Sequence, residues 1–397
     1  MNLGGGLKCF GQSHDLGREY EQEKKGSRAK APSQEQEAGR EEKSSEARKI
    51  KRNEFSFGRG QAIMPELEAL VKALSNPKAY PHSPKSVELV QTQISFVFLA
   101  GDYVYKVKKP VDFGFLDFTT LEKRRFYCNQ EVALNRRLCS NIYLGVVGIT
   151  KKGRTFTVEG SGREVEYAVK MRPLPYQRMM DRMLQSDQVT PQMVEMVAKR
   201  LVEFHHRAEI NEEQAKIGGL DTVNRNAEEN FSQVNSYVNR TITKKQYEQI
   251  KDYTHSFLKK NATLFAKRVK EGRIRDCHGD LHAAHICFID GLCIFDCIEF
   301  NDRFRYIDVA NEIAFLAMDL DFHRRSKLSE HFAEAYVKAS GDKELLKLLD
   351  FYKCYRAYVR GKVESFQLDD PHISGDQKSK TLDKARRYFE LAESYIS

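Results

Sequence analysis

The sequence lacks any run of 18 or more apolar residues, which is the length that a membrane-spanning helix needs. Its first residues, MNLGGGLKCFGQSHDLG, also lack the long apolar stretch of a secretory signal. Eight cysteines stand at irregular spacings, which is typical of reduced thiols and not of a disulfide framework. We therefore expect a soluble cytoplasmic protein that does not engage a membrane.

Signatures of nucleic-acid binding are equally absent. There is no zinc-finger spacing and no aromatic RNA-binding motif. The net charge of +9 comes from 65 Lys+Arg against 56 Asp+Glu, and the two signs are interspersed along the chain. This pattern predicts a solvated surface of mixed charge without a nucleic-acid partner, and a modestly basic protein also suits a nucleoside triphosphate as ligand.

Two glycine-rich phosphate-binding motifs are missing as well. Neither G-x-G-x-x-G nor the P-loop G-x-x-x-x-G-K-[ST] occurs anywhere in the chain. Where a kinase would carry its glycine-rich loop, the sequence has QISF, and the hydroxyl of Ser95 could contact phosphate there. The alternative is that Ser95 is an ordinary serine at a strand edge.

The apolar content divides the chain into segments. Residues 1–63 have almost no apolar periodicity, which predicts a disordered tail. We expect a β-rich N-lobe over 64–170, a proline-punctuated hinge over 171–176 and a mostly helical C-lobe over 177–397. The helices predicted in the C-lobe cover 190–209, 223–240, 243–272, 328–340, 344–367 and 376–396. This order is an α+β fold with the bilobal plan of protein kinases.

The segment DCHGDLHAAHICFIDGLCIFD, residues 276–296, carries most of the chemistry. Asp280 stands in a short loop, His285 follows five residues later, and Asp296 ends a short apolar strand. In phosphoryl-transfer sites, the first of these positions accepts the proton of the substrate hydroxyl, and the other two hold Mg²⁺ against the nucleotide phosphates. We therefore predict Asp280 as the catalytic base, with Asp296 and His285 as metal ligands.

A strand and a helix in the N-lobe supply two further candidates. Lys106, in VYK, lies where the second strand of a predicted hairpin would carry a phosphate-binding lysine, and Glu131 on the following helix would hold it. The alternative is an exposed lysine beside Lys108 and an exposed helical glutamate. The order of strand, lysine, helix, glutamate, hinge and Asp loop favours the functional interpretation. Met171, at the start of the hinge, is expected beside the nucleotide.

With these parts in this order, the chain resembles the aminoglycoside phosphotransferase/choline kinase-like family. It is similar in particular to bacterial members fused to a P-loop ATPase or gluconokinase-like domain. The resemblance runs from about Met64 to near residue 370 and rests on FVFLAGDYVYKVKKPVDFGFLDFTTLEKRRF, VKMRPLP, CHGDLHAAHI and IFDCIEFNDRFRYIDVANEIAFLAMDLD. It implies a protein-kinase-like fold, ATP or GTP with Mg²⁺, and transfer of phosphate to a hydroxyl of a small molecule. It also implies supporting roles for His278 and for Asp308, the latter as a buttress of the catalytic loop.

The chain departs from the family pattern at two points. Residue 285 is His where the family has a metal-binding Asn, and an imidazole ligand would favour Mn²⁺ more than an Asn would. No P-loop sequence follows the kinase-like part, so a separate P-loop protein acting in trans is an expected partner.

Two other functions remain open from the sequence. His278, Asp280, His282 and His285 would together suit the zinc site of a metallohydrolase. The replacement at residue 285 would suit a pseudokinase that binds a nucleotide or only a partner protein. The acceptor is likewise open: cationic side chains would suit an acidic acceptor, whereas acidic ones would suit a cationic acceptor. The cationic candidates are Arg356, Arg360 and Lys362, and the acidic candidates are Asp319 and Asp321.

Overall fold

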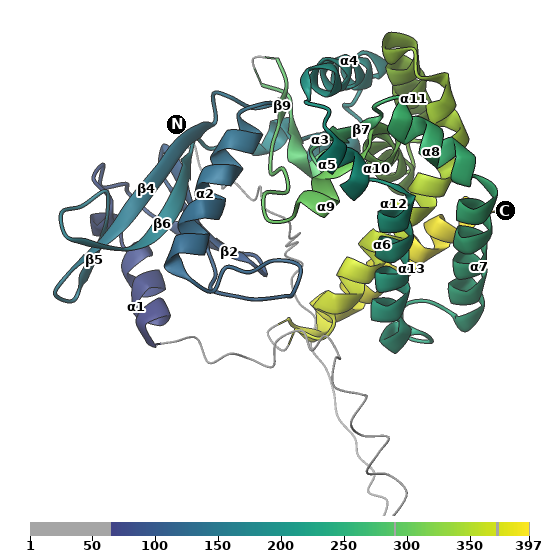
Figure 1. Ribbon diagram of the computed structural model, residues 1–397. Helices are drawn as coiled ribbons and strands as arrows, with labels where there is room; N and C mark the ends of the chain where they lie inside the picture. Colours follow the sequence, from purple (N-terminus) through teal and green to yellow (C-terminus); the bar gives the residue numbers. More distant parts are fainter. Residues whose placement is uncertain (1–64, 290, 371–372, 397) are drawn as a thin grey trace, which may run out of the picture.

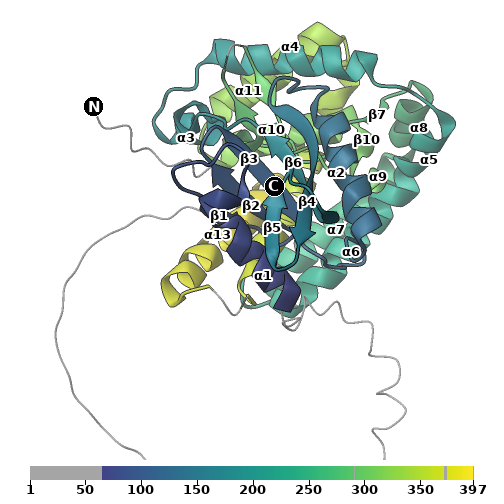
Figure 2. The same cartoon turned by 90° about the vertical axis from the view of Figure 1, so that its left-hand side faces the viewer.

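The computed structural model describes residues 65–289, 291–370 and 373–396, and the predicted tail of residues 1–63 lies outside them. Figure 1 shows a β-rich part on the left and a helical part on the right, with short strands between them. Figure 2, turned by 90°, shows the sheet in front of the helices. The α+β fold class is confirmed, with a small β-rich part followed by a mostly helical one. The lobe and hinge boundaries stay a prediction.

Six antiparallel strands form one sheet in the order β1-β2-β3-β6-β4-β5. They are β1 (Glu88–Gln91), β2 (Ser95–Ala100), β3 (Tyr103–Lys108), β4 (Tyr143–Lys152), β5 (Thr155–Val158) and β6 (Arg163–Met171). Helix α1 (Pro65–Leu74) packs against β5, and helix α2 (Leu121–Asn135) packs against β6 and β4. The two helices join different apolar clusters, one on each face of the sheet.

Strand β3 is buried on both faces, and this decides where its lysines point. Val107 belongs to the apolar cluster under α1, whereas Val104 belongs to the cluster under α2. Because successive side chains of a strand alternate between faces, Lys106 and Lys108 share the α2 face with Val104. Both lysines are therefore buried next to Glu131 of α2.

The C-terminal end of α2 contacts the segment that carries the predicted site. Asn135, the last residue of α2, accepts a hydrogen bond from the backbone N–H of Cys297 at 2.9 Å. Arg137 forms an ion pair with Asp276 at 3.0 Å. These two contacts, at Asp276 and Cys297, hold the segment with the predicted site against the end of α2.

A disulfide bond joins Cys139, which follows α2, to Cys293 in β9. The prediction of uniformly reduced thiols is therefore wrong. The two cysteines are 154 residues apart in sequence but their Cα atoms are 4.7 Å apart, and spacing along the chain gives no sign of such a pairing. Five other cysteines within the described residues are free and buried: Cys128, Cys277, Cys287, Cys297 and Cys354.

The second part of the chain is mostly helical. Its helices are α3 (Met180–Gln185), α4 (Pro191–Arg207), α5 (Glu212–Ile217), α6 (Leu220–Val234), α7 (Lys244–Lys260), α8 (Ala262–Lys270), α9 (Asp302–Arg305), α10 (Val309–Phe322), α11 (Ser326–Ser340), α12 (Leu346–Gln367) and α13 (Gly375–Ser394). Two short antiparallel pairs lie among them: β7 (Ile274–Asp276) with β10 (Tyr306–Asp308), and β8 (Ile286–Cys287) with β9 (Cys293–Ile294). Among the helices of the described residues, none combines the length and the apolar character needed to cross a membrane.

The sequence prediction differs from the structure at several helices: the short helices α3, α5 and α9 were not predicted, and two longer segments also differ. The single helix predicted over 243–272 is two helices, because the chain breaks at Asn261 between α7 and α8. Helix α10 was not predicted, because nearly all its residues are buried and its sequence shows no polar face. This central helix lies directly behind the predicted catalytic loop.

Candidate active site

The loop at residues 278–280 is held by its backbone. Glu312 of α10 accepts hydrogen bonds from the N–H groups of His278 at 2.7 Å and Gly279 at 2.8 Å. Arg356 of α12 donates to the carbonyl of Gly279 at 3.1 Å. Gly279 has a φ of +86°, and a Cβ atom there would lie 2.8 Å from the carbonyl oxygen of Phe304. Only glycine fits this position without displacing the backbone, so the loop presents Asp280 in a fixed direction.

His278 supports this loop from inside. It is fully buried, and its Nε2 lies 2.8 Å from the carbonyl oxygen of Phe295. Its Nδ1 accepts a hydrogen bond from the backbone N–H of Asp280 at 3.3 Å. Both ring nitrogens are thus engaged with backbone, and burial lowers the pKa of the imidazole. The four-residue zinc site predicted as an alternative therefore loses His278 as a ligand.

The side chain of Asp280 lies beside two imidazoles. Its Oδ2 is 3.6 Å from Nε2 of His282 and 3.5 Å from Nδ1 of His285. About a third of the Asp280 side chain is exposed, so a substrate can reach it. Partial burial would raise the pKa of this carboxyl, but His282 and His285 outweigh it and hold the pKa far below its usual range. Asp280 is therefore ionised at neutral pH.

Asp296 lies on the other side of His285. Its Oδ2 is 3.7 Å from Nε2 of His285, and its Oδ1 accepts a hydrogen bond from Nζ of Lys106 at 2.6 Å. The residue has a φ of +63°, which is uncommon for a non-glycine residue and is found preferentially at functional sites. Burial would raise the pKa of Asp296, and Lys106 more than offsets this, so the pKa is lowered.

A buried network of charges connects Asp296 to the sheet. Lys106 pairs with Glu131 at 2.9 Å as well as with Asp296. Lys108 pairs with Glu131 at 2.7 Å and also with Glu299. Two lysines thus balance three carboxylates in an interior where an unpaired charge would be costly. Lys106 and Glu131 were predicted at this site, whereas Lys108 and Glu299 were not assigned to the network. The sequence signal for the network is a pair of lysines at alternate positions of a strand, followed by a helical glutamate that can face both.

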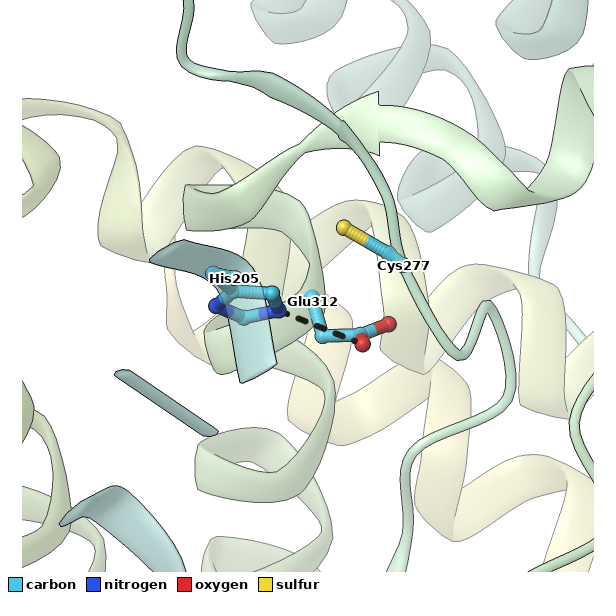
Figure 3. Close-up of side chains that lie close together, drawn as sticks. All are labelled: His205, Cys277 and Glu312. Atoms are coloured by element: carbon cyan, nitrogen blue, oxygen red, sulfur yellow. Dashed lines mark ion pairs between the residues drawn. The ribbon is translucent and has the colours of Figure 1, made fainter. Parts of the chain in front are cut away.

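Behind the loop lies a second cluster, which the sequence analysis did not find. Figure 3 shows His205 of α4, Cys277 and Glu312, with an ion pair between His205 and Glu312 at 3.5 Å. His205 also lies 2.8 Å, through Nδ1, from the hydroxyl of Tyr336. All three side chains are buried. Through Glu312, which binds the backbone of the catalytic loop, the cluster connects this loop to helices α4 and α11.

The structure also gives the positions of three further predicted residues. Ser95 is completely buried in β2, where a phosphate cannot reach it, so its hydroxyl does not line this site. Met171, at the end of β6, is buried in the apolar cluster under α2. Asp308 caps α10 and binds Arg268 through both oxygens, at 2.6 and 2.7 Å. Asp308 also pairs with Ile274 in β7, the strand that precedes the loop, while Glu312, one turn further along α10, contacts the loop backbone itself.

The charged residues considered for the acceptor are mostly engaged within the protein. Arg356 binds Asn311 and the loop carbonyl, and Lys362 binds Asn230 and Gln233. Asp319 accepts the N–H of Ala283, and Asp321 accepts from Lys353 and Tyr395. Arg360 pairs with Glu364 at 3.7 Å and lies over the ring of Tyr388, while its buried Nε has no hydrogen-bond partner among the described residues. Its charge also acts on Asp280.

Comparison with known proteins finds a family to which part of the chain is similar. Residues 157–351, which include Asp280, Asp296 and Glu312, match the family described as the phosphotransferase enzyme family. Proteins of Mycobacterium tuberculosis and Mycobacterium bovis are each 34% identical to the chain over 293 residues, covering 73% of this chain and 57% of the relative. The chain thus spans little more than half the length of these curated relatives. Residues 157–351, about half of the chain, are therefore similar to the phosphotransferase enzyme family.

Solved structures with a related path of the chain include kinases of small alcohols. A choline/ethanolamine kinase family protein from Mesorhizobium loti is 11% identical, with a TM-score of 0.43 over 83% of this chain and 99% of its own. Ethanolamine kinase of Plasmodium vivax is 13% identical, with a TM-score of 0.43 over 90% of this chain and 95% of its own. Likenesses at this level carry no conclusion about chemistry, which depends on the residues described above.

Proposed function

We propose that the chain is an ATP-dependent kinase that transfers a phosphate group to the hydroxyl of a small molecule. One observation carries this proposal. Asp280 and Asp296 flank His285 at 3.5 and 3.7 Å, and Lys106, 190 residues earlier than Asp296, lies 2.6 Å from it. The proton acceptor, the metal-binding carboxylate and the phosphate-binding lysine of a phosphoryl-transfer site thus meet in one place.

Asp280 acts in this proposal as the proton acceptor for the substrate hydroxyl. Its low pKa makes it a weak base, which suits a reaction in which the hydroxyl loses its proton late, after most of the bond to the leaving group has broken. The backbone contacts of the loop fix the direction of the carboxylate. Positioning of this kind supplies most of the rate in phosphoryl transfer.

The residues around Asp296 fit a divalent cation and a nucleotide. The carboxylate of Asp296 offers the hard oxygen that Mg²⁺ prefers, and His285 would add a nitrogen that makes Mn²⁺ more acceptable. A bound cation would supply neutralisation of the phosphate charge. Lys106 would contact the phosphates of ATP or GTP while Glu131 keeps it in place, and Met171 would lie on the nucleotide side of the hinge. A cytoplasmic location remains part of this proposal.

Replacing Asp280 by Asn tests the proposal directly. We expect ATP consumption with a panel of sugars, polyols, amino alcohols and aminoglycosides to fall at least about 100-fold, the usual contribution of a general base. Nucleotide binding should persist, because the amide has the shape of the carboxylate. Asp187→Asn, at a side chain that is 82% exposed, serves as the control. Equal turnover by the Asp280 variant and the wild type would refute the assignment of the base.

A nucleotide-binding protein without turnover is the second candidate. The observation that favours it is His285, whose ring lies between the two carboxylates where kinases have an asparagine. Binding of nucleotide by the wild type, with no ATP consumed on any acceptor of the panel, would support this candidate over the kinase.

A further inference from the structure

Asp280, His282 and His285 bring three metal-ligating atoms together at the mouth of the site. One atom from each side chain lies within 4.8 Å of the other two. The carboxylate oxygen of Asp280 is 3.6 Å from Nε2 of His282 and 3.5 Å from Nδ1 of His285. In a tetrahedral zinc site with bonds of about 2.0–2.1 Å, neighbouring ligand atoms are about 3.4 Å apart. The two distances from Asp280 already lie close to that spacing, and the nitrogens of His282 and His285 lie within 4.8 Å of each other.

We propose that Asp280, His282 and His285 form a binding site for a transition-metal dication such as Zn²⁺ or Co²⁺ on the Nδ1 side of His285, whereas the Mg²⁺ position at Asp296 lies on its Nε2 side. Two imidazoles and one carboxylate are a typical ligand set for such ions, whereas Mg²⁺ prefers oxygen. The fourth position would be left to water or to a substrate group.

The surroundings of His285 allow both of its tautomers. Its Nδ1 now lies 2.9 Å from the carbonyl oxygen of Asp280, and its Nε2 lies 3.7 Å from Asp296. Binding of a metal through Nδ1 would replace the contact with the carbonyl, and the N–H on Nε2 would then face the carboxylate of Asp296. A carboxylate behind a metal-bound histidine orients the ring and raises its basicity.

The site can be reached from solvent and has a mixed charge environment. The side chains of His282 and His285 are 9% and 15% exposed, and that of Asp280 is a third exposed. Asp296 lies nearby and favours a cation, while Arg360 acts on Asp280 and opposes one.

The cluster of His205, Cys277 and Glu312 also places three ligand types together, but it suits a metal less well. Both oxygens of Glu312 already accept backbone N–H groups. The thiol of Cys277 donates to the carbonyl of Ile307 at 3.6 Å, and burial raises its pKa well above the usual value. Metal binding needs the thiolate, which this environment disfavours.

Metal binding at this site does not depend on the proposed kinase reaction, although one consequence does. A dication on Asp280 would occupy the carboxylate that accepts the proton from the substrate. If the chain is a kinase, Zn²⁺ should therefore inhibit it even when Mg²⁺ is in excess, and a chelator should reverse the inhibition.

The test is a titration of tag-free, metal-stripped full chain with ZnCl₂ followed by calorimetry, without nucleotide. We expect one site whose affinity falls at least tenfold in His282→Ala and in His282→Gln. His206→Ala, at an exposed histidine of α4, is the matched control and should bind Zn²⁺ as the wild type does. Circular dichroism and melting temperature would establish that each variant is folded.

Titration with Co²⁺ identifies the ligands independently. Nitrogen and oxygen ligands give only weak visible bands, whereas a thiolate ligand adds an intense charge-transfer band in the near ultraviolet. We expect no such band, and no change of the spectrum in Cys277→Ser. Unchanged Zn²⁺ affinity in both folded His282 variants, a thiolate band, or failure of the folded wild type to bind Zn²⁺ would each overturn the proposal. Loss of kinase activity in Asp280→Asn would be unaffected by any of these results.

Discussion

Two buried glutamates on either side of the site are stabilised in different ways. Glu131 of α2 is balanced by charges, since Lys106 and Lys108 lie 2.9 and 2.7 Å from its two oxygens. Glu312 of α10 has no lysine or arginine partner among these contacts: each of its oxygens accepts a backbone N–H of the catalytic loop, and His205 lies 3.5 Å from one of them. Burial would raise the pKa of both carboxyls, and in both the surroundings lower it instead.

The difference between them indicates which side of the site can rearrange. A lysine has a long flexible side chain and three donors, so Lys106 can exchange one anionic partner for another while keeping Glu131. The backbone of the loop has no such freedom, because moving it would leave buried N–H groups without acceptors. We infer that the sheet side adapts to the nucleotide, whereas the loop side keeps Asp280 in place.

The largest effect is expected from Lys108→Met, which removes one of the two lysines that balance Glu131. Glu299 loses its ion-pair partner and Glu131 keeps only Lys106, both deep in the interior. Breaking a buried ion pair on one side costs about 3–5 kcal/mol, so the free energy of unfolding measured with urea should fall by about that much. Lys123→Met, in an exposed pair with Asp117, should change it by less than about 1 kcal/mol. Similar small losses in both variants would contradict the charge-balanced description.

A smaller effect is expected from Glu312→Ala, which removes the carboxylate that accepts the backbone N–H groups of the catalytic loop. The N–H groups of His278 and Gly279 lose their partner, at a cost of about 2–3 kcal/mol in unfolding free energy. Amide hydrogen exchange at these two residues should become faster, while the amides of β3 stay protected. Glu312→Gln keeps one acceptor oxygen and should lie between the alanine variant and the wild type. Unchanged exchange at Gly279 would mean that Glu312 does not hold the loop.

The smallest effect is expected in how the free energy of unfolding falls as the pH is lowered. The pKa of Glu312 is below its ordinary value of 4.5, because burial, which would raise it, is outweighed by His205, by His278 and by the backbone N–H of the loop. Its carboxylate therefore stabilises the fold above about pH 4.5, and this contribution is lost as the pH falls below that value. Between pH 7 and pH 3.5, the free energy of unfolding measured with urea should fall less in Glu312→Gln than in Glu330→Gln, the control at an exposed glutamate. Parallel curves for the two variants would rule out this contribution.

Much of the site could be predicted from the sequence because its parts come in a fixed order. The spacing from Asp280 to Asp296 and the succession of strand, lysine, helix and glutamate indicated which residues would converge, and the structure brings them together. Glu312 was missed because α10 has no amphipathic pattern; a glutamate within the apolar run VANEIAFLAMDLD is itself a signal, since a buried charge needs partners. The pairing of Lys108 with Glu299 depends on contacts 191 residues apart in sequence, which no local pattern encodes.

The bond between Cys139 and Cys293 closes part of the chain into a covalent ring. The ring contains Asp280, while the segment with Lys106 and Glu131 and the segment with Asp296 leave it as two arms from neighbouring points. Along the bridge, Glu131 lies eight positions from Cys139 and Asp296 lies three positions from Cys293, although the chain itself runs through the ring between them. A single cut by a protease anywhere within the ring would consequently leave both arms in one molecule, and the pieces would part only after reduction.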